Sequence, residues 1–367
     1  MIYLDNAATT RMNPEAAELY AHLATEQYAN SESLHTFGFS VQQLLDHARD
    51  ALAKKAGVKP EEFFFAPCGT LADNTAILGT VDPNKRGGRI VTSAFEHPAV
   101  AECMKKLESS FDVVYLRPEN GIITPEQLSR ALTPDTRLVS IMHVNNETGA
   151  VADLRALSAV IRRSGCGALF HTDAIQGFLK EPLSYSCVDL ASFSAHKTHG
   201  PKGLGALYVR RGVRIRPVYY GGGHEKGLFS GTVNVPGIAA WAKAVENTDC
   251  LRERTYVEGL NTLCRSLLLP LGARIVSPEH ASPYILSVIF PNYIAENIIH
   301  ALSRSGIAVS SGSACSSRHP GAVFRALGLE SYAKNALRIS FCAQNTEAEI
   351  RRFAEVLSGT LGSLIQK

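Results

Sequence analysis

The sequence predicts an α/β protein with a mainly parallel sheet, followed by a smaller α+β domain. Short apolar runs alternate with helical patterns from about residue 40 to about residue 245. The runs are rich in Val, Ile, Leu and Phe, which is typical of strands that are covered on both faces. Such alternation favours parallel strands joined by right-handed crossovers. After Trp241 the pattern changes, which indicates a second unit.

The individual elements follow from local patterns. A helix is predicted over residues 40–56, because its apolar residues form one stripe and Gly57 provides a stop. Strands of the large sheet are predicted at 89–93, 113–116, 138–144, 168–172, 189–193 and 205–209. For the second unit we expect a long helical stretch to about residue 268, strands near 284–290 and 337–341, and helices at 293–305 and 321–327.

Composition excludes several classes of protein. The 367 residues are 45% hydrophobic and 19% charged, and the formal charge of +3 is small, so neither nucleic acid nor a membrane surface is expected as a partner. The first residues lack the basic stretch and apolar core of a signal peptide, and we expect a cytoplasmic protein. The eight cysteines are scattered without CxxC spacing, which argues against a zinc site and a disulfide framework.

Lys197 is the first candidate for chemistry. It follows the apolar run 189–193 within Ser194-Ala195-His196-Lys197, and open α/β sheets bind ligands at the carboxyl ends of their strands. A lysine there can lose its proton through desolvation and form a Schiff base with pyridoxal 5'-phosphate (PLP) or another carbonyl compound. The alternative is a solvated loop lysine.

Asp173 follows the predicted strand 168–172, and Gln176 lies three positions further, near the expected start of a helix. A buried carboxylate is costly unless it meets a positive charge. The pyridine nitrogen of PLP is such a partner, because an aspartate keeps it protonated and the ring can then accept electrons. An ordinary helix N-cap is the other interpretation of Asp173.

Other predicted strand ends carry polar residues too. His97 precedes Pro98, which can open a helix, and an imidazole there can stack on a cofactor ring and move protons. Asn145 and Asn146 follow an apolar strand. Cys68-Gly69-Thr70 precedes the helical stretch 71–78, so its N–H groups and the Thr70 hydroxyl can hold a phosphate.

These residues belong to blocks that run almost from end to end of the chain. The blocks are Tyr3-Leu4-Asp5-Asn6-Ala7-Ala8-Thr9-Thr10, Ser33-Leu34-His35, Glu96-His97-Pro98-Ala99-Val100, His143-Val144-Asn145-Asn146-Glu147, Thr172-Asp173-Ala174-Ile175-Gln176, Ser194-Ala195-His196-Lys197, Gly221-Gly222-Gly223-His224-Glu225, Ser230-Gly231-Thr232 and Ser310-Ser311-Gly312-Ser313-Ala314-Cys315. With them the chain resembles the PLP-dependent cysteine desulfurases of the class V aminotransferase group, in the subgroup with the SSGSAC loop.

The resemblance implies the PLP-dependent transferase fold type I, with a mainly parallel seven-stranded sheet. It implies a large PLP-binding domain at residues 14–250. Residues 1–13 and 251–367 would form the small α+β domain that carries the catalytic cysteine. It also implies a homodimer, because the residue matching Thr232 reaches the phosphate bound in the other subunit.

The resemblance further implies roles for single residues. Lys197 would hold PLP, Asp173 would pair with the ring nitrogen, His97 would stack on the ring, and Asn146 and Gln176 would reach the region of the phenolic oxygen. The phosphate would be held by Gly69, Thr70, Ser194 and His196. Arg338 would bind the substrate carboxylate in a bidentate pair, with Asn146 beside it.

Cys315 lies in a Ser- and Gly-rich segment, a composition typical of a loop, and would be the nucleophile. It would take the sulfur of L-cysteine as a persulfide and pass it to a protein acceptor for iron–sulfur cluster assembly or tRNA thiolation, with L-alanine as the other product. Lys197 would take the α-proton, and His97 is a candidate base for the substrate thiol. Two alternatives remain: another class V PLP enzyme, such as a selenocysteine lyase or an aminotransferase, and a non-catalytic sulfur-relay scaffold.

The chain departs from the family's pattern at several positions, which indicates a divergent member. Leu71 stands where a glutamate is usual, and Phe229 stands where an arginine is usual. Asn30-Ser31-Glu32-Ser33 replaces a common Asn-Pro-Ser-Ser, and Phe341-Cys342-Ala343-Gln344 stands where a Gly-Arg pair is frequent. We expect Cys68 and Cys342 to be structural.

Overall fold

The computed structural model describes residues 1–82, 84, 86–312 and 321–364. Its largest sheet has seven strands in the order β2-β8-β7-β6-β5-β3-β4. In that order they are β2 (Phe63–Ala66), β8 (Gly205–Val209), β7 (Leu190–Ser194), β6 (Leu169–Asp173), β5 (Thr136–Ser140), β3 (Arg89–Ser93) and β4 (Asp112–Leu116). Strands β4, β3, β5, β6 and β7 are parallel, whereas β8 is antiparallel to both of its neighbours.

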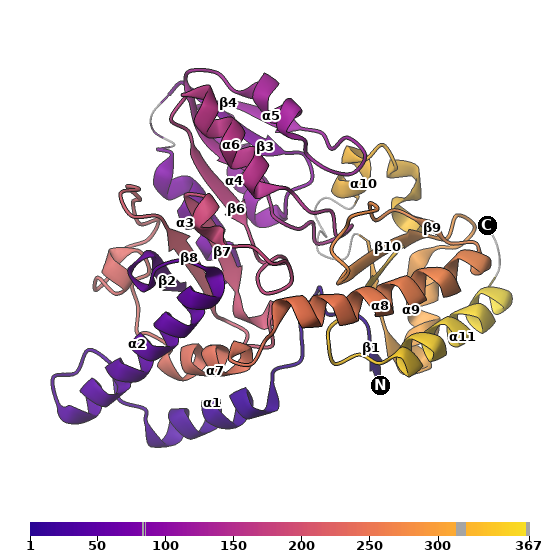
Figure 1. Ribbon diagram of the computed structural model, residues 1–367, viewed down its shortest axis with the longest axis horizontal. Coiled ribbons are helices and arrows are strands. Elements are labelled where there is room, and N and C mark those ends of the chain that lie inside the picture. The colour runs from indigo at the N-terminus through magenta and orange to yellow at the C-terminus, as the bar shows by residue number, and fades with distance from the viewer. Residues whose placement is uncertain (83, 85, 313–320, 365–367) are drawn as a thin grey trace.

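Both faces of this sheet are buried. Alternate side chains of each strand point to opposite faces, so one strand contributes to two apolar clusters. Phe63 and Phe65 of β2 join one apolar cluster, and Phe64 between them joins another. Helices α3 (Gly69–Thr80) and α4 (Pro98–Leu107) cover the second face. The first face is covered by α2 (Thr36–Ala56), α5 (Pro125–Ala131), α6 (Leu154–Ser164) and α7 (Val235–Val245), and α1 (Pro14–Glu26) packs on α7 (Figure 1).

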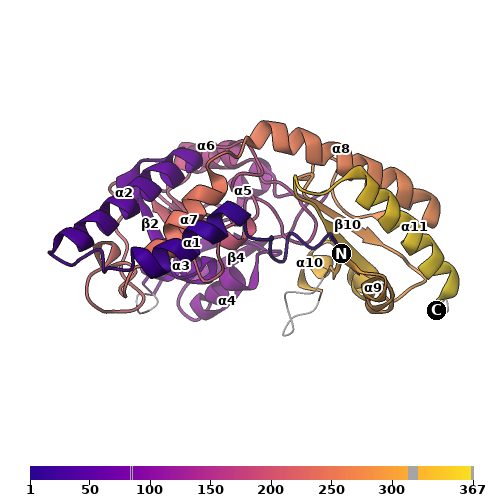
Figure 2. The same cartoon turned by 90° about the horizontal axis from the view of Figure 1, so that it is seen from below.

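A second, antiparallel sheet lies beside the first. Its order is β12-β13-β10-β9, with β12 (Ser310–Ser311), β13 (Ala336–Ser340), β10 (Ile285–Ile289) and β9 (Arg274–Ile275). Helices α8 (Cys250–Leu268), α9 (Ala295–Arg304) and α11 (Glu347–Ser363) share its apolar core, and α8 and α11 lie side by side (Figure 2). The short helix α10 is Ala322–Ala326. At the N-terminus, β1 (Ile2–Tyr3) pairs in parallel with β11 (Ile307–Ala308).

The predicted fold class is confirmed: the large sheet is mostly parallel, has seven strands and is covered on both faces. Strand 63–66 was not among the strands predicted from the residue pattern, and the strand predicted at 138–144 ends at Ser140. Helix α2 begins at Thr36, four residues before the predicted start, because the His35 ring caps it by accepting from Gly38 N at 3.0 Å. The division into domains at residues 13/14 and 250/251 remains a prediction.

Two further expectations are wrong. The stretch from Trp241 to residue 268 is not one helix, because the Asp249 side chain accepts from Arg252 N at 3.1 Å and starts α8 anew. Residues 175–180 form turns rather than a helix. The chain turns tightly there because Gly177 packs on His143, where a Cβ would lie 2.1 Å from His143 Nδ1. In the part of the chain that the structure describes, no helix is both long and apolar enough to span a bilayer.

Candidate functional site

A cavity of about 530 Å³ opens where β6 and β7 end and α3 begins. The carboxyl ends of neighbouring parallel strands meet at one sheet edge, so residues far apart in sequence line the same space. The predicted residues on its wall are Gly69, Thr70, His97, Asn146, Asp173, Gln176, Ser194, His196 and Lys197. Nine of the predicted residues therefore lie around one cavity, and their roles remain predictions.

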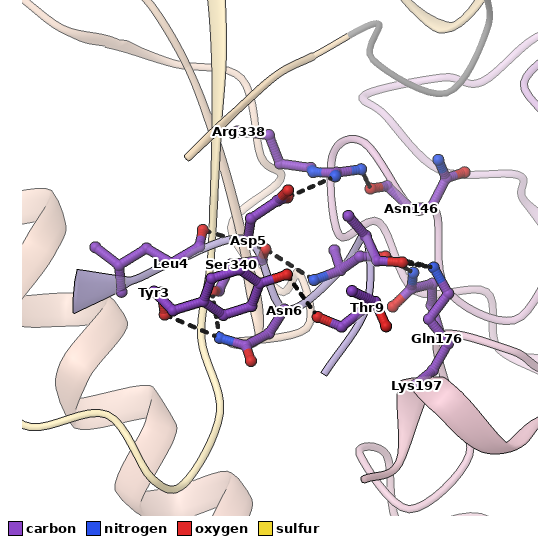
Figure 3. A network of polar contacts seen from close by, with 12 residues as sticks. Tyr3, Leu4, Asp5, Asn6, Thr9, Asn146, Gln176, Lys197, Arg338 and Ser340 are labelled. Carbon is purple, nitrogen blue, oxygen red and sulfur yellow. Dashed lines mark hydrogen bonds and ion pairs between the residues drawn. The ribbon is translucent and has the colours of Figure 1, made fainter. Parts of the chain in front are cut away.

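Lys197 lies in a single 3₁₀ turn, Ala195–Lys197, directly after β7. Its Nζ donates to the carbonyl oxygens of Ala7 (2.7 Å) and Ala8 (2.8 Å) in the N-terminal segment (Figure 3). These contacts span about half of the chain and hold the amine at the cavity wall.

Asp173 is the last residue of β6 and is buried. Burial raises the pKa of its carboxyl to about 7, because water no longer stabilises the charged form. Its Oδ1 accepts from Ile175 N at 2.9 Å, but no described Lys, Arg or His forms an ion pair with it. No helix follows, so Asp173 is not an N-cap. A buried carboxylate in this state fits a ligand that brings a cationic nitrogen.

The N-terminus of α3 fits an anion. Within the described part of the chain, its N-cap Cys68 makes no side-chain capping bond, which leaves the first N–H groups of a twelve-residue helix facing the cavity end. Gly69 is required by a close approach, since a Cβ there would lie 2.4 Å from Ile175 Cδ1. PLP carries a phosphate, a ring nitrogen that can be cationic and a carbonyl group. The N-terminus of α3, Asp173 and Lys197 match these three groups, so the residues present fit this cofactor.

His97 caps α4, and its Nδ1 accepts from Ala99 N at 3.1 Å. Burial lowers the pKa of its ring, which keeps the imidazole neutral. A neutral ring that accepts at Nδ1 carries its proton on Nε2. Because Nδ1 already accepts from Ala99 N, Nε2 is the ring atom of His97 that remains to donate a hydrogen bond to a ligand.

Two predicted residues that the structure describes, Arg338 and Thr232, are not on the wall of this cavity. Arg338 is fully buried, and its guanidinium donates to Asn146 O at 2.9 Å and Asp5 Oδ1 at 3.0 Å (Figure 3). Thr232 lines a separate cavity of about 140 Å³, which shares Gly203 and Leu204 with the main one. Cys315 lies outside the described residues.

Sequence reasoning missed other residues at the cavity. Lys202 lines it, and so do Ala7 and Ala8, whose carbonyl oxygens accept hydrogen bonds from Lys197. A backbone acceptor leaves no residue-type signal. The one signal for Lys202 in the sequence is a charged residue between Pro201 and Gly203, five residues after Lys197. Cys68 is half-buried at the wall, and Cys342 is buried.

Comparison with known proteins agrees with this geometry. The family model described as Aminotransferase class-V matches residues 2–353. The chain is 40% identical over 377 residues to a cysteine desulfurase of Gluconacetobacter diazotrophicus, covering 99% of this chain and 94% of the relative. It is also 40% identical over 381 residues to the cysteine desulfurase IscS of Escherichia coli, covering 99% of this chain and 93% of the relative.

Solved structures give the same result. A NifS-like protein superposes with a TM-score of 0.92 at 38% identity, covering 99% of this chain and all (100%) of the other. The structure described as SspA in complex with cysteine superposes with a TM-score of 0.84 at 31% identity, covering 94% of this chain and 100% of the other. The chain therefore belongs to the class-V aminotransferase family and, within it, to the PLP-dependent cysteine desulfurases.

Proposed function

We propose that this protein removes the sulfur of L-cysteine at the cavity around Lys197, stores it on Cys315 as a persulfide and releases L-alanine. The observation that carries the proposal is that Lys197, the buried carboxylate of Asp173 and the open N-terminus of α3 line one cavity. A relative solved as a complex with cysteine supports the choice of substrate.

The cofactor would be held by residues of one chain at three points. The N–H groups of Gly69 and Thr70, with Ser194 and His196, would bind the phosphate, and Asp173 would pair with the ring nitrogen. When bound, PLP supplies a carbonyl to an amine and a ring that accepts electrons from the substrate's α-carbon. His97 would cover the ring and donate a hydrogen bond from Nε2.

The substrate would be oriented by Arg338 and Asn146 and deprotonated at its α-carbon by the Lys197 amine. Cys315 Sγ, as a thiolate, forms a bond to the substrate's sulfur while the bond between that sulfur and the β-carbon breaks. The electron pair of the broken bond stays with the carbon skeleton, which takes up protons and leaves as L-alanine. The Lys197 amine, which lines the cavity, would return one of them.

The finer points are also proposals. The persulfide would pass to a protein acceptor, in iron–sulfur cluster assembly or in tRNA thiolation. The working form would be a homodimer in which Thr232 reaches the partner's phosphate. A reactive thiol and the free cysteines suit the reducing cytoplasm.

The test is a product assay on purified protein with L-cysteine and a reductant. Alanine and sulfide are expected in equal amounts from the parent chain, and both are expected to disappear in Lys197→Ala and in Cys315→Ala. Undiminished turnover of the Cys315→Ala variant would favour a selenocysteine lyase or an aminotransferase. No alanine from the PLP-loaded parent chain would favour a non-catalytic sulfur relay.

A further inference from the structure

A second lysine lies close to the cofactor cavity and has no part in the mechanism above. Lys180 is buried, with 8% of its surface exposed. Its Nζ donates to Gln176 Oε1 at 3.0 Å and lies 6.0 Å from the centre of the Tyr284 ring. Lys180 and Lys197 both line a small cavity of about 30 Å³, which shares Lys197 with the main one. A buried amine is costly, so its retention calls for a reason.

The contacts of Gln176 fix which way its amide is turned. Its Nε2 donates to Ala7 O at 2.8 Å, and a carbonyl oxygen can only accept. Its Oε1 therefore faces Lys180, which has N–H groups to donate whether or not it is charged. Burial, followed by the charge of Lys197, lowers the pKa of Lys180 to about 7. Flipping the amide would place oxygen against oxygen at Ala7.

The same carbonyl links the two lysines. Ala7 O accepts from Gln176 Nε2 at 2.8 Å and from Lys197 Nζ at 2.7 Å. A continuous chain of hydrogen bonds therefore runs from Lys180 through Gln176 and Ala7 to the amine at the cavity wall. Gln176 itself lines the main cavity.

The backbone holds Lys180 in this place at a cost. Leu179, directly before it, has a φ of +61°, a conformation that a branched side chain rarely adopts. The turn is closed by Lys180 N and Glu181 N, which both donate to Gly177 O (3.0 and 2.9 Å). Glu181 is held in turn by Arg254 of α8, with Nε 3.1 Å from Oε2. Strain that the surroundings maintain is frequent where a side chain must be aimed.

We propose that Lys180 is a positioning residue that locks the Gln176 amide, so that Nε2 remains the hydrogen-bond donor offered to the cofactor. The phenolic oxygen of PLP accepts hydrogen bonds in its ionised form, and an amide oxygen turned toward it would repel it. This inference rests on the proposed function, in which Gln176 reaches that oxygen.

The first test measures cofactor affinity. The cofactor-free protein is titrated with PLP and binding is followed by visible absorbance. Lys180→Met is expected to raise the dissociation constant about tenfold, the effect of one well-placed hydrogen bond. Lys55→Met is the matched control, because Lys55 is half-buried and donates to Thr248 O at 2.8 Å. It is expected to stay within about twofold of the parent. An unchanged dissociation constant for Lys180→Met overturns the proposal.

The second test asks whether Lys180 acts through Gln176. In a Gln176→Ala background, Lys180→Met is expected to change the PLP dissociation constant by less than about twofold, because the amide that it orients is gone. A loss as large as in the parent background would show a direct or purely structural effect, which contradicts the proposal.

A third comparison guards against misfolding. Thermal melting of the cofactor-free variants reports whether each one folds. If Lys180→Met does not fold, Lys180→Gln replaces it, since its amide is one bond too short to reach Gln176 Oε1. The same tenfold loss is expected, and parent-like affinity overturns the proposal. Because these experiments measure PLP binding, they can fail while alanine release succeeds, and the reverse.

Discussion

Arg338 Nη2 lies 3.0 Å from Asp5 Oδ1, and this contact joins residues that are 333 positions apart. The Arg338 side chain is fully buried, and its Nη1 donates to Asn146 O at 2.9 Å. Nε is buried and has no hydrogen-bond partner among the described residues. Asp5 thus orients the guanidinium and compensates its charge.

Removing Asp5 is expected to destabilise the protein. Asp5→Ala leaves a buried guanidinium with one partner fewer, and the free energy of unfolding is expected to fall by about 2 kcal/mol. Urea denaturation measures the change. Asp50→Ala, at an exposed aspartate of α2, is the control and is expected to change it by less than about 0.5 kcal/mol. Equal effects of the two substitutions would contradict this role of Asp5.

Lys197 and Asp173 were predictable from the sequence because each is linked to a short apolar strand, and strand ends of a parallel sheet gather on one edge. The direction of β8 was not, since an apolar run has no direction. It follows from the connection 195–204, which is too short for a helical crossover to a parallel strand. The roles of Asp5 and Lys180 depend on contacts between distant segments or on one strained turn, for which the sequence carries no local pattern.

Asp73 is expected to make stability fall as pH rises. It is fully buried on α3, 3.5 Å from His171 Nε2, and burial raises the pKa of its carboxyl to about 7. Between pH 4 and 7 the folded chain therefore binds a proton that the unfolded chain has lost, so the free energy of unfolding decreases with pH.

Asp73→Asn replaces the titrating carboxyl with an amide, which does not take up this proton. From pH 5 to pH 8 the cofactor-free variant is expected to lose about 2 kcal/mol less stability than the parent, measured by urea denaturation at both pH values. Asp50→Asn, an exposed aspartate, serves as the control. A variant that follows the parent's pH profile would show that Asp73 titrates normally.

Leu71 and Phe229, which stand where the family usually has a glutamate and an arginine, pack in one apolar cluster with Phe64 and Leu207. The two departures are therefore expected to compensate each other. Phe229→Arg alone should cost about 3 kcal/mol of unfolding free energy, because it buries an unpaired charge. Leu71→Glu alone should cost about 1 kcal/mol, since Leu71 is only partly buried.

The double variant, Leu71→Glu with Phe229→Arg, tests whether the two positions interact. It is expected to be at least about 1 kcal/mol more stable than the sum of the single effects, because the new charges can pair. Phe39→Arg, at a residue 62% exposed, is the control for adding the charge and should be neutral. Strict additivity in thermal or urea denaturation would mean that the two positions are independent.

The family resemblance implies that Thr232 serves the partner's cofactor, and Thr232 does not line the cavity around Lys197 in its own chain. Dimers that combine one Lys197→Ala subunit with one Thr232→Ala subunit test this. If Thr232 acts across the interface, one site in each mixed dimer is intact, and half of the sites bind PLP with parental affinity. If it acts within its own subunit, no site does.

The central claim is that the Lys197 amine carries the cofactor. The most direct measurement is reduction of the PLP-loaded protein with borohydride, followed by peptide mass mapping, which fixes the cofactor to the amine that holds it. The account predicts one phosphopyridoxyl group, on the peptide that contains Lys197. Labelling of Lys180 or Lys202 in its place, or no labelled lysine at all, would contradict it.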